Sequence, residues 1–223
     1  MKNNQKLLCS AIVLLLLFVL WTILICLVDV RIVGPQDSSI GFATSNVFFH
    51  NFTGVHMMLY NITDWLGLVP IGFAMGFAFL GLVQWIKRKK FLKVDYSILV
   101  LGGFYIVVMT LYIFFEMFVI NYRPVLINGY LEASYPSSTT MLVMCVMPTS
   151  IIQFNARIKN NVIKRSVTLV IIIFIVFMVL GRMFSGVHWL TDIVGGAILS
   201  AGLVMMYCFV NSIERKVVPY FSF

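Results

Sequence analysis

Six long apolar stretches separated by short polar segments make up most of this chain. A hydrocarbon core of about 30 Å takes roughly 20 apolar residues of helix to cross. The stretches therefore predict membrane-spanning helices over residues 7–28, 65–86, 96–116, 138–155, 166–184 and 190–211. We expect an all-α integral membrane protein, a six-transmembrane-helix bundle, in which residues 1–223 form a single membrane domain.

Polar residues mark the ends of several of these spans. The fourth and fifth are short as charge-free runs, so residues 135–139 and Arg182 are expected inside the helical ends, at membrane depth. The longest linker, residues 29–64, contains the stretch FFHNFTGVHMMLY, whose apolar content indicates an interfacial helix or lid. The first stretch is too long for the apolar region of a secretory signal and lacks a cleavage site after it, so we interpret it as a span.

Composition and charge fit this picture. Hydrophobic residues make up 61% of the chain and charged residues 11%. Only Arg31, Arg123 and Arg182 of the 16 basic residues fall on one side of a six-span arrangement, which leaves 13 on the other. The positive-inside rule makes that basic side, with both termini, cytoplasmic, and we expect the plasma membrane. Because topology explains the net charge of +8, nucleic acid is not an expected partner.

The segment GRMFSGVHWLTD, residues 181–192, combines three ionisable side chains near the basic-poor membrane face. Ionisable groups at bilayer depth are costly, so a function is the leading hypothesis. His188 and Asp192 are four apart, so on a helix they would share a face and the carboxylate could accept an imidazole N–H. Arg182 could bind a phosphate that the ring attacks, with Arg123 as a second ligand. The group predicts phosphoryl transfer.

These residues also match a known pattern. The spacing Arg182-x5-His188-x3-Asp192, preceded by Arg123-Pro and by Pro-Ser137, resembles the type 2 phosphatidic acid phosphatase superfamily, membrane enzymes that dephosphorylate lipid phosphates and diphosphates. The resemblance implies six helices, no metal or other cofactor, and a phosphohistidine at His188 oriented by Asp192. It also implies phosphate binding by the residues at the matching positions of its motifs: Arg123, Arg182, Ser137 and Ser138.

The sequence departs from that family at four positions. Glu116 stands where the first motif has a lysine, and Gly181 stands where the third has a serine. In the second motif, YPSSTT, Ser138 replaces a glycine and Thr139 replaces a histidine. In the resembling enzymes, the histidine at the position of Thr139 protonates the leaving group. General acid catalysis is worth roughly a factor of 10² to 10⁴, so its loss needs an explanation.

Three explanations stay open. A diphosphate substrate expels a phosphate monoester, which is stable as an anion and needs no acid. Another group could be the acid; candidates on the same side are Glu116, Glu132, Tyr135, His50 and His56. Of these, the two histidines fit an ordinary polar face of an interfacial helix better. Finally, the chain could bind lipid headgroups without catalysis. Glu116 itself could pair with Arg123 or meet a cationic part of the substrate.

The sequence thus predicts a lipid phosphatase or phosphotransferase that acts on a lipid phosphate or diphosphate at the outer membrane face. Leaving-group chemistry favours an isoprenoid diphosphate. The alternatives are a headgroup-binding or scaffold protein on the same fold and a lipid transporter, although no repeated halves or broken helices indicate a transport site. The expected partners are the lipid substrate and the surrounding membrane lipids.

Overall fold

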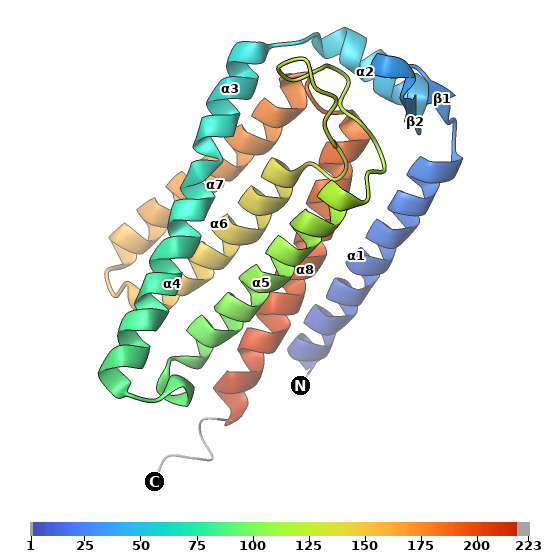
Figure 1. Ribbon diagram of the computed structural model, residues 1–223. Helices are drawn as coiled ribbons and strands as arrows, with labels where there is room; N and C mark the ends of the chain where they lie inside the picture. Colours follow the sequence, from blue (N-terminus) through green and yellow to red (C-terminus); the bar gives the residue numbers. More distant parts are fainter. Residues whose placement is uncertain (1, 218–223) are drawn as a thin grey trace.

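The computed structural model describes residues 2–217, and Figure 1 shows them as a bundle of long helices. The long helices are α1 (Lys2–Leu27), α4 (Leu68–Arg88), α5 (Tyr96–Met117), α6 (Ser138–Arg157), α7 (Asn161–Phe184) and α8 (Leu190–Val217). The shorter elements are β1 (Arg31–Ile32), η1 (Pro35–Asp37), β2 (Ser39–Ile40), α2 (Ala43–Thr53), α3 (Met57–Leu66) and η2 (Phe91–Lys93).

Six segments of this described part are long and apolar enough to cross a membrane. Many of their large apolar side chains are exposed, such as Leu16 at 63%, Phe79 at 66% and Val170 at 65%, as expected of surfaces that face lipid. The predicted all-α fold with six membrane-spanning helices is therefore confirmed, and the protein is an integral multi-pass membrane protein.

The second span is longer than the sequence predicts. It runs from Met57 to Arg88, as α3 and α4 joined at Gly67, whose backbone N–H donates to the carbonyls of Thr63 and Asp64, both at 3.0 Å. Asp64 interrupts the apolar run, but a helix continues through a polar residue as long as its backbone bonds are made. The linker predicted over residues 29–64 therefore ends before Met57 and contains the β1–β2 pair and α2.

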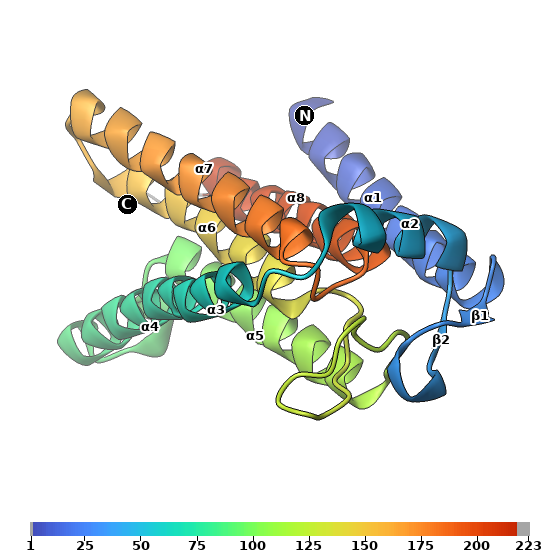
Figure 2. The same ribbon diagram turned by 90° about the horizontal axis from the view of Figure 1, so that it is seen from above.

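Helices α6 and α8 lie in the middle of the bundle. α6 contacts α4, α5, α7 and α8, while α8 also contacts α1, α2 and α5. In Figure 2, α1 lies on one side of this centre and α4 lies on the far side. Helix α6 and the α7–α8 turn accordingly supply several fully enclosed side chains, among them Val143, Cys145 and Val187, all 0% exposed.

The two ends of the bundle differ. The start of α1, the end of α8, and the α4–α5 and α6–α7 connections lie together at the lower end in Figure 1. The β1–β2 pair, α2, the long segment between α5 and α6, and the α7–α8 turn gather at the upper end. His188 belongs to that turn and Arg123 to the long segment, so both lie at the end away from the start of α1 and the end of α8.

Candidate active site

A short hairpin between α5 and α6 brings distant residues of the site together. Tyr122 bridges Ala133, and Ile127 bridges Tyr130 around a turn at Asn128 and Gly129, whose φ angles are +50° and +84°. An Asn-Gly pair with two positive φ angles is the usual two-residue hairpin turn. Two further backbone bonds join the strands in a register shifted by two residues from that of the turn, from Arg123 N–H to the carbonyl of Glu132 (3.0 Å) and from Ser134 N–H to that of Asn121 (2.9 Å).

The turn between α7 and α8 holds His188, and the linker before α3 fixes that turn. His56 N–H donates to the Ser185 carbonyl at 2.9 Å. Gly186 has a φ of +68°, and a Cβ there would lie 1.9 Å from the Gly54 carbonyl oxygen. This backbone contact requires glycine, because any side chain would collide with the linker.

The prediction that His188 and Asp192 share one face of a helix is wrong. Helix α8 begins at Leu190, so the histidine precedes the helix and the aspartate lies in its first turn. The two side chains are joined through Ser134, whose Oγ lies 3.0 Å from His188 Nδ1 and 2.5 Å from Asp192 Oδ2. All three residues are at most 4% exposed.

This arrangement selects one form of the imidazole. Asp192 also accepts from Asn121 Nδ2 at 3.2 Å and from Trp189 N–H at 3.0 Å, as an ionised carboxylate does. The single Ser134 hydroxyl proton then points to Asp192, and the hydroxyl oxygen accepts from His188 Nδ1–H. Nε2 is left with a lone pair, and Arg182 Nη2 lies 3.5 Å from it. Burial, together with Arg123 and Arg182, lowers the pKa of His188 well below its usual value and keeps the ring neutral.

The two predicted arginines meet at the same place. Arg182 is 1% exposed and Arg123 is 7% exposed. Their guanidinium carbons lie 4.7 Å and 5.7 Å from the ring centroid of Tyr60 on α3. Thr63 Oγ1 accepts from Arg182 Nη1 at 3.4 Å. Helix α3, which the sequence assigned to a linker, therefore supplies part of the wall of the site.

Two guanidinium nitrogens of this pair, Nη1 of Arg123 and Nε of Arg182, are buried without a hydrogen-bond partner in the described chain. Nε of Arg123 makes no hydrogen bond of good geometry either, although it forms an ion pair with Glu132. Buried donors without acceptors are uncommon and costly. Both arginines line a cavity of about 580 Å³ between α3–α4, α5 and α6. Donors of this kind, beside a neutral imidazole, suit an oxyanion with several acceptor oxygens.

Acidic side chains line the same cavity. Glu132 Oε2 lies 3.2 Å from Arg123 Nε, and Asp64 Oδ1 lies 3.6 Å from Arg182 Nη1. Glu116 also contributes to the wall. Asp64 was not among the residues predicted from sequence, because the second span was expected to start after it.

The remaining predicted site residues divide into two groups. Ser138 and Thr139 line the cavity. Ser137 is the N-cap of α6, and its Oγ accepts from Thr140 N–H at 3.5 Å and from Thr140 Oγ1 at 3.0 Å. Tyr135 is turned toward α1, where its hydroxyl lies 2.7 Å from Thr22 Oγ1. Burial also raises the pKa of Tyr135, so this phenol is a poor acid.

His50 and His56 lie outside the cavity wall. The ring of His50 packs at 5.5 Å from that of Trp189, and burial lowers its pKa. His56 Nε2 is 2.9 Å from the Thr53 carbonyl. Both interactions are local to α2 and its contacts with the α7–α8 turn.

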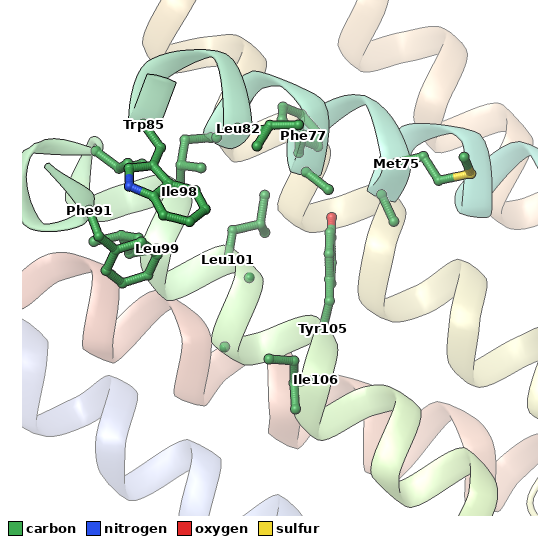
Figure 3. Close-up of a pocket in the computed structure, with 16 residues that line it drawn as sticks. Met75, Phe77, Leu82, Trp85, Phe91, Ile98, Leu99, Leu101, Tyr105 and Ile106 are labelled. Carbon is green, nitrogen blue, oxygen red and sulfur yellow. The ribbon is translucent and has the colours of Figure 1, made fainter. Parts of the chain in front are cut away.

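A second large cavity lies further along the α4–α5 gap, as Figure 3 shows. Its volume is about 610 Å³, and its walls are almost entirely apolar, with Met75, Leu82, Trp85, Leu101 and Ile106 among the lining residues. Ile71 and Met109, one helical turn from Met75 and Tyr105, line the cavity of the arginines instead. The α4–α5 gap is thus charged near the site and apolar toward the other end.

Comparisons with known proteins agree with this site. Residues 117–215 match the model of the PAP2 superfamily, a region that begins one residue after Glu116 and includes Arg123, Arg182, His188 and Asp192. Among solved structures, the chain is similar to the crystal structure of a transmembrane PAP2 type phosphatidylglycerolphosphate phosphatase from Bacillus subtilis. The TM-score is 0.55 and the sequence identity 17%, over 92% of this chain and 96% of that one.

At that identity, the structural likeness shows a shared fold. Comparison with curated protein sequences gives no match. The family model and the fold agree with the motifs around Arg123, Ser137 and His188, and they confirm the resemblance seen in the sequence. The protein is a multi-pass membrane protein that shares the fold of a transmembrane PAP2-type phosphatase, and its residues 117–215 match the PAP2 superfamily.

Proposed function

We propose that the protein is a lipid phosphatase or phosphotransferase that works through a phosphohistidine at His188. One observation carries this proposal. A buried imidazole, bonded at Nδ1 through Ser134 to Asp192, has its Nε2 3.5 Å from Arg182 Nη2. Arg182 and Arg123 line one cavity, and each has a buried N–H group without an acceptor in the described chain. A nucleophile oriented by a third group and facing preorganised donors is the arrangement that phosphoryl transfer needs.

In the first step, the Nε2 lone pair attacks phosphorus, the N–P bond forms, and the bond from phosphorus to the leaving oxygen breaks. Arg123 and Arg182 stabilise the charge on the phosphoryl oxygens. The Nδ1 proton stays on the ring, and Ser134 and Asp192 stabilise the positive charge that develops there. In the second step, water or an acceptor alcohol attacks phosphorus, loses a proton, and releases His188.

The leaving group restricts the substrate. Thr139 and Ser138 line the cavity, but a hydroxyl is too weak an acid to protonate an alkoxide near neutral pH. A diphosphate avoids this difficulty, because the departing phosphate monoester is already stable as an anion. On these grounds we propose an isoprenoid diphosphate as the preferred class among substrates that bring no acid of their own.

The position of the site supports action at the outer face. His188 lies at the end of the bundle away from the basic connections at residues 87–93 and 157–165. The positive-inside rule assigns that basic end to the cytoplasm, with both termini, and we expect the plasma membrane. A lipid whose phosphate binds Arg182 would place its chain along the apolar part of the α4–α5 gap.

Phosphate release from lipid diphosphates is the direct test. We expect the purified protein to cleave a polyprenyl diphosphate at least about 100-fold faster than the monophosphate, the lower value of general acid catalysis. Thr139→His should raise monophosphate cleavage by a similar factor and leave diphosphate cleavage nearly unchanged. The reason is that the monophosphate expels an alkoxide, which needs a proton to leave, whereas the diphosphate expels a phosphate that is stable as an anion.

Leu142→Ile is a suitable control for the Thr139 variant, since it alters the same wall without adding an acid. No release from any lipid phosphate would favour a headgroup-binding or scaffold protein. Movement of labelled lipid across a proteoliposome without cleavage would instead favour transport.

The Ser134 connection gives a separate prediction. Ser134→Ala should lower kcat about 10- to 100-fold, as for other groups that orient an active residue, and Ser134→Thr should restore much of it. The chain has three histidines, so ¹⁵N-histidine NMR of a His50→Gln/His56→Gln protein reports His188 alone. We expect protonated Nδ1 with Ser134 and a tautomer mixture with alanine. An unchanged tautomer would show that Ser134 only fills space.

A further inference from the structure

The cavity carries more negative than positive side chains. Two guanidinium groups, from Arg123 and Arg182, face three carboxylates, from Asp64, Glu116 and Glu132. Glu132 and Asp64 each pair with one arginine. Within residues 4–213, whose side chains are described, Glu116 forms no ion pair. The wall therefore has an excess of one negative charge before any substrate enters.

This charge balance conflicts with a ligand that is only an anion. Buried N–H groups of Arg123 and Arg182 indicate that an oxyanion binds at one end of the cavity. A phosphate brings up to two negative charges, and the unpaired carboxylate of Glu116 in the same wall would oppose its entry. The conflict disappears if the ligand carries a cation of its own on the Glu116 side.

We propose that the cavity binds a lipid phosphate with an ammonium group close to the phosphate, as in a 2-aminoalkyl phosphate. The phosphate lies against His188 and the two arginines, and the ammonium lies against Glu116 and Glu132. This inference rests on the proposed function and narrows its substrate. The 2-aminoalkyl phosphate unit occurs in monoesters of long-chain amino alcohols and in ethanolamine phosphodiesters, and the experiment below separates the two.

Such a substrate would also bring the missing proton. In a 2-aminoalkyl monoester, the ammonium can donate to the leaving oxygen two carbons away through a five-membered ring. When His188 Nε2 bonds to phosphorus, the P–O bond breaks and the ammonium proton moves to the leaving alkoxide, which departs as an amino alcohol. The later attack of water on the phosphohistidine releases phosphate and one proton to solvent. Thr139 then needs no acid function.

A simpler explanation covers only part of the observation. Carboxylates that hold arginines in place between turnovers account for Glu132 and Asp64, each of which contacts a guanidinium group. They do not account for Glu116, which forms no ion pair within residues 4–213. An effect of Glu116 on the preference for an amine therefore distinguishes binding of a substrate ammonium group from carboxylates that only hold the arginines in place.

The experiment compares a long-chain 2-amino-1-phosphate with its N-acetyl derivative, which has the same chain and no charge on nitrogen. We expect the wild type to prefer the amine by about tenfold or more in kcat/KM, as for a charge-assisted hydrogen bond. Glu116→Gln should reduce the preference to about twofold, and Glu116→Lys should reverse it. Asp29→Asn, at a half-buried ion-pair partner of Arg31 at the same end, should leave the preference unchanged.

Equal cleavage of the two compounds by the wild type, or an undiminished preference in Glu116→Gln, overturns the inference. Ethanolamine released from phosphatidylethanolamine vesicles, with little phosphate from the monoester, would identify the diester as the source. If none of these lipids is cleaved, the proposed function fails, and the inference about the ammonium group is then tested by binding alone. Tighter binding of phosphoethanolamine than of its N-acetyl form, lost in Glu116→Gln, supports the inference, and equal binding overturns it.

Discussion

Replacing His188 with alanine should reduce phosphate release by about 10⁴-fold or more, because the variant has no nucleophile to form the covalent intermediate. The remaining arginines would still bind the substrate, so KM should change much less than kcat. Brief mixing with a ³²P-labelled lipid diphosphate, followed by alkaline quenching, should label the wild-type protein and leave the His188→Ala protein unlabelled.

His56→Ala is the matched control, because that histidine bonds to a local carbonyl outside the cavity wall and should keep nearly full activity. Equal, low release from the wild type and His188→Ala would show that the site binds lipid without cleaving it. Release that persists without labelling would point to direct attack by water.

The protonation state of His188 adds a pH signature to the same experiment. Burial lowers its pKa first, and the positive charges of Arg123 and Arg182 lower it further. A lowered pKa keeps the imidazole neutral as the pH falls, so the attacking form persists below the usual histidine value of about 6.5. NMR of the protein with His188 as its single histidine should show a neutral ring at pH 6, where an exposed histidine is largely protonated.

The fold follows from the sequence because the hydrocarbon core imposes a length and an apolar composition that few other structures share. The predicted start of the second span, at residue 65, was wrong for a physical reason. Thr63 and Asp64 are polar, yet they lie on a helix end beside the buried arginine Arg182, where a hydroxyl and a carboxylate are useful. A hydropathy pattern treats polar residues as the end of a span and misses helices that supply an active site.

The site was predictable where its spacing is local and unpredictable where it depends on pairing across a loop. Arg182, His188 and Asp192 lie within eleven residues, and the structure brings them together. Ser134 reaches His188 only because the hairpin sets residues 121–123 opposite 132–134. The Asn128-Gly129 pair is a known signal for a two-residue turn, but the register of that turn would place Arg123 opposite Ser134. The bridge between Tyr122 and Ala133 is shifted by two residues from that register, so the turn signal alone would not have aligned Asn121 with Ser134.

Arg182→Met should separate activity from stability. Loss of one donor group for the developing charge should lower kcat/KM about 10²- to 10³-fold. The same change should not lower the melting temperature in detergent. Arg182 is 1% exposed with Nε unsatisfied, and its partner Asp64 is 57% exposed and can be solvated when left alone. Replacing a poorly satisfied buried charge by an apolar side chain of similar size is often neutral or stabilising.

Arg31→Met is the control, since Arg31 also lies at the upper end and pairs with an aspartate, but its side chain is 62% exposed and remote from the cavity. Its activity and melting temperature should both stay near those of the wild type. Arg182→Lys should recover only part of the activity, because one ammonium group cannot donate two parallel bonds to a phosphate. A melting temperature that falls together with activity in Arg182→Met would show that the guanidinium group stabilises the fold. The prediction that Arg182 contributes to activity but not to stability would then be wrong.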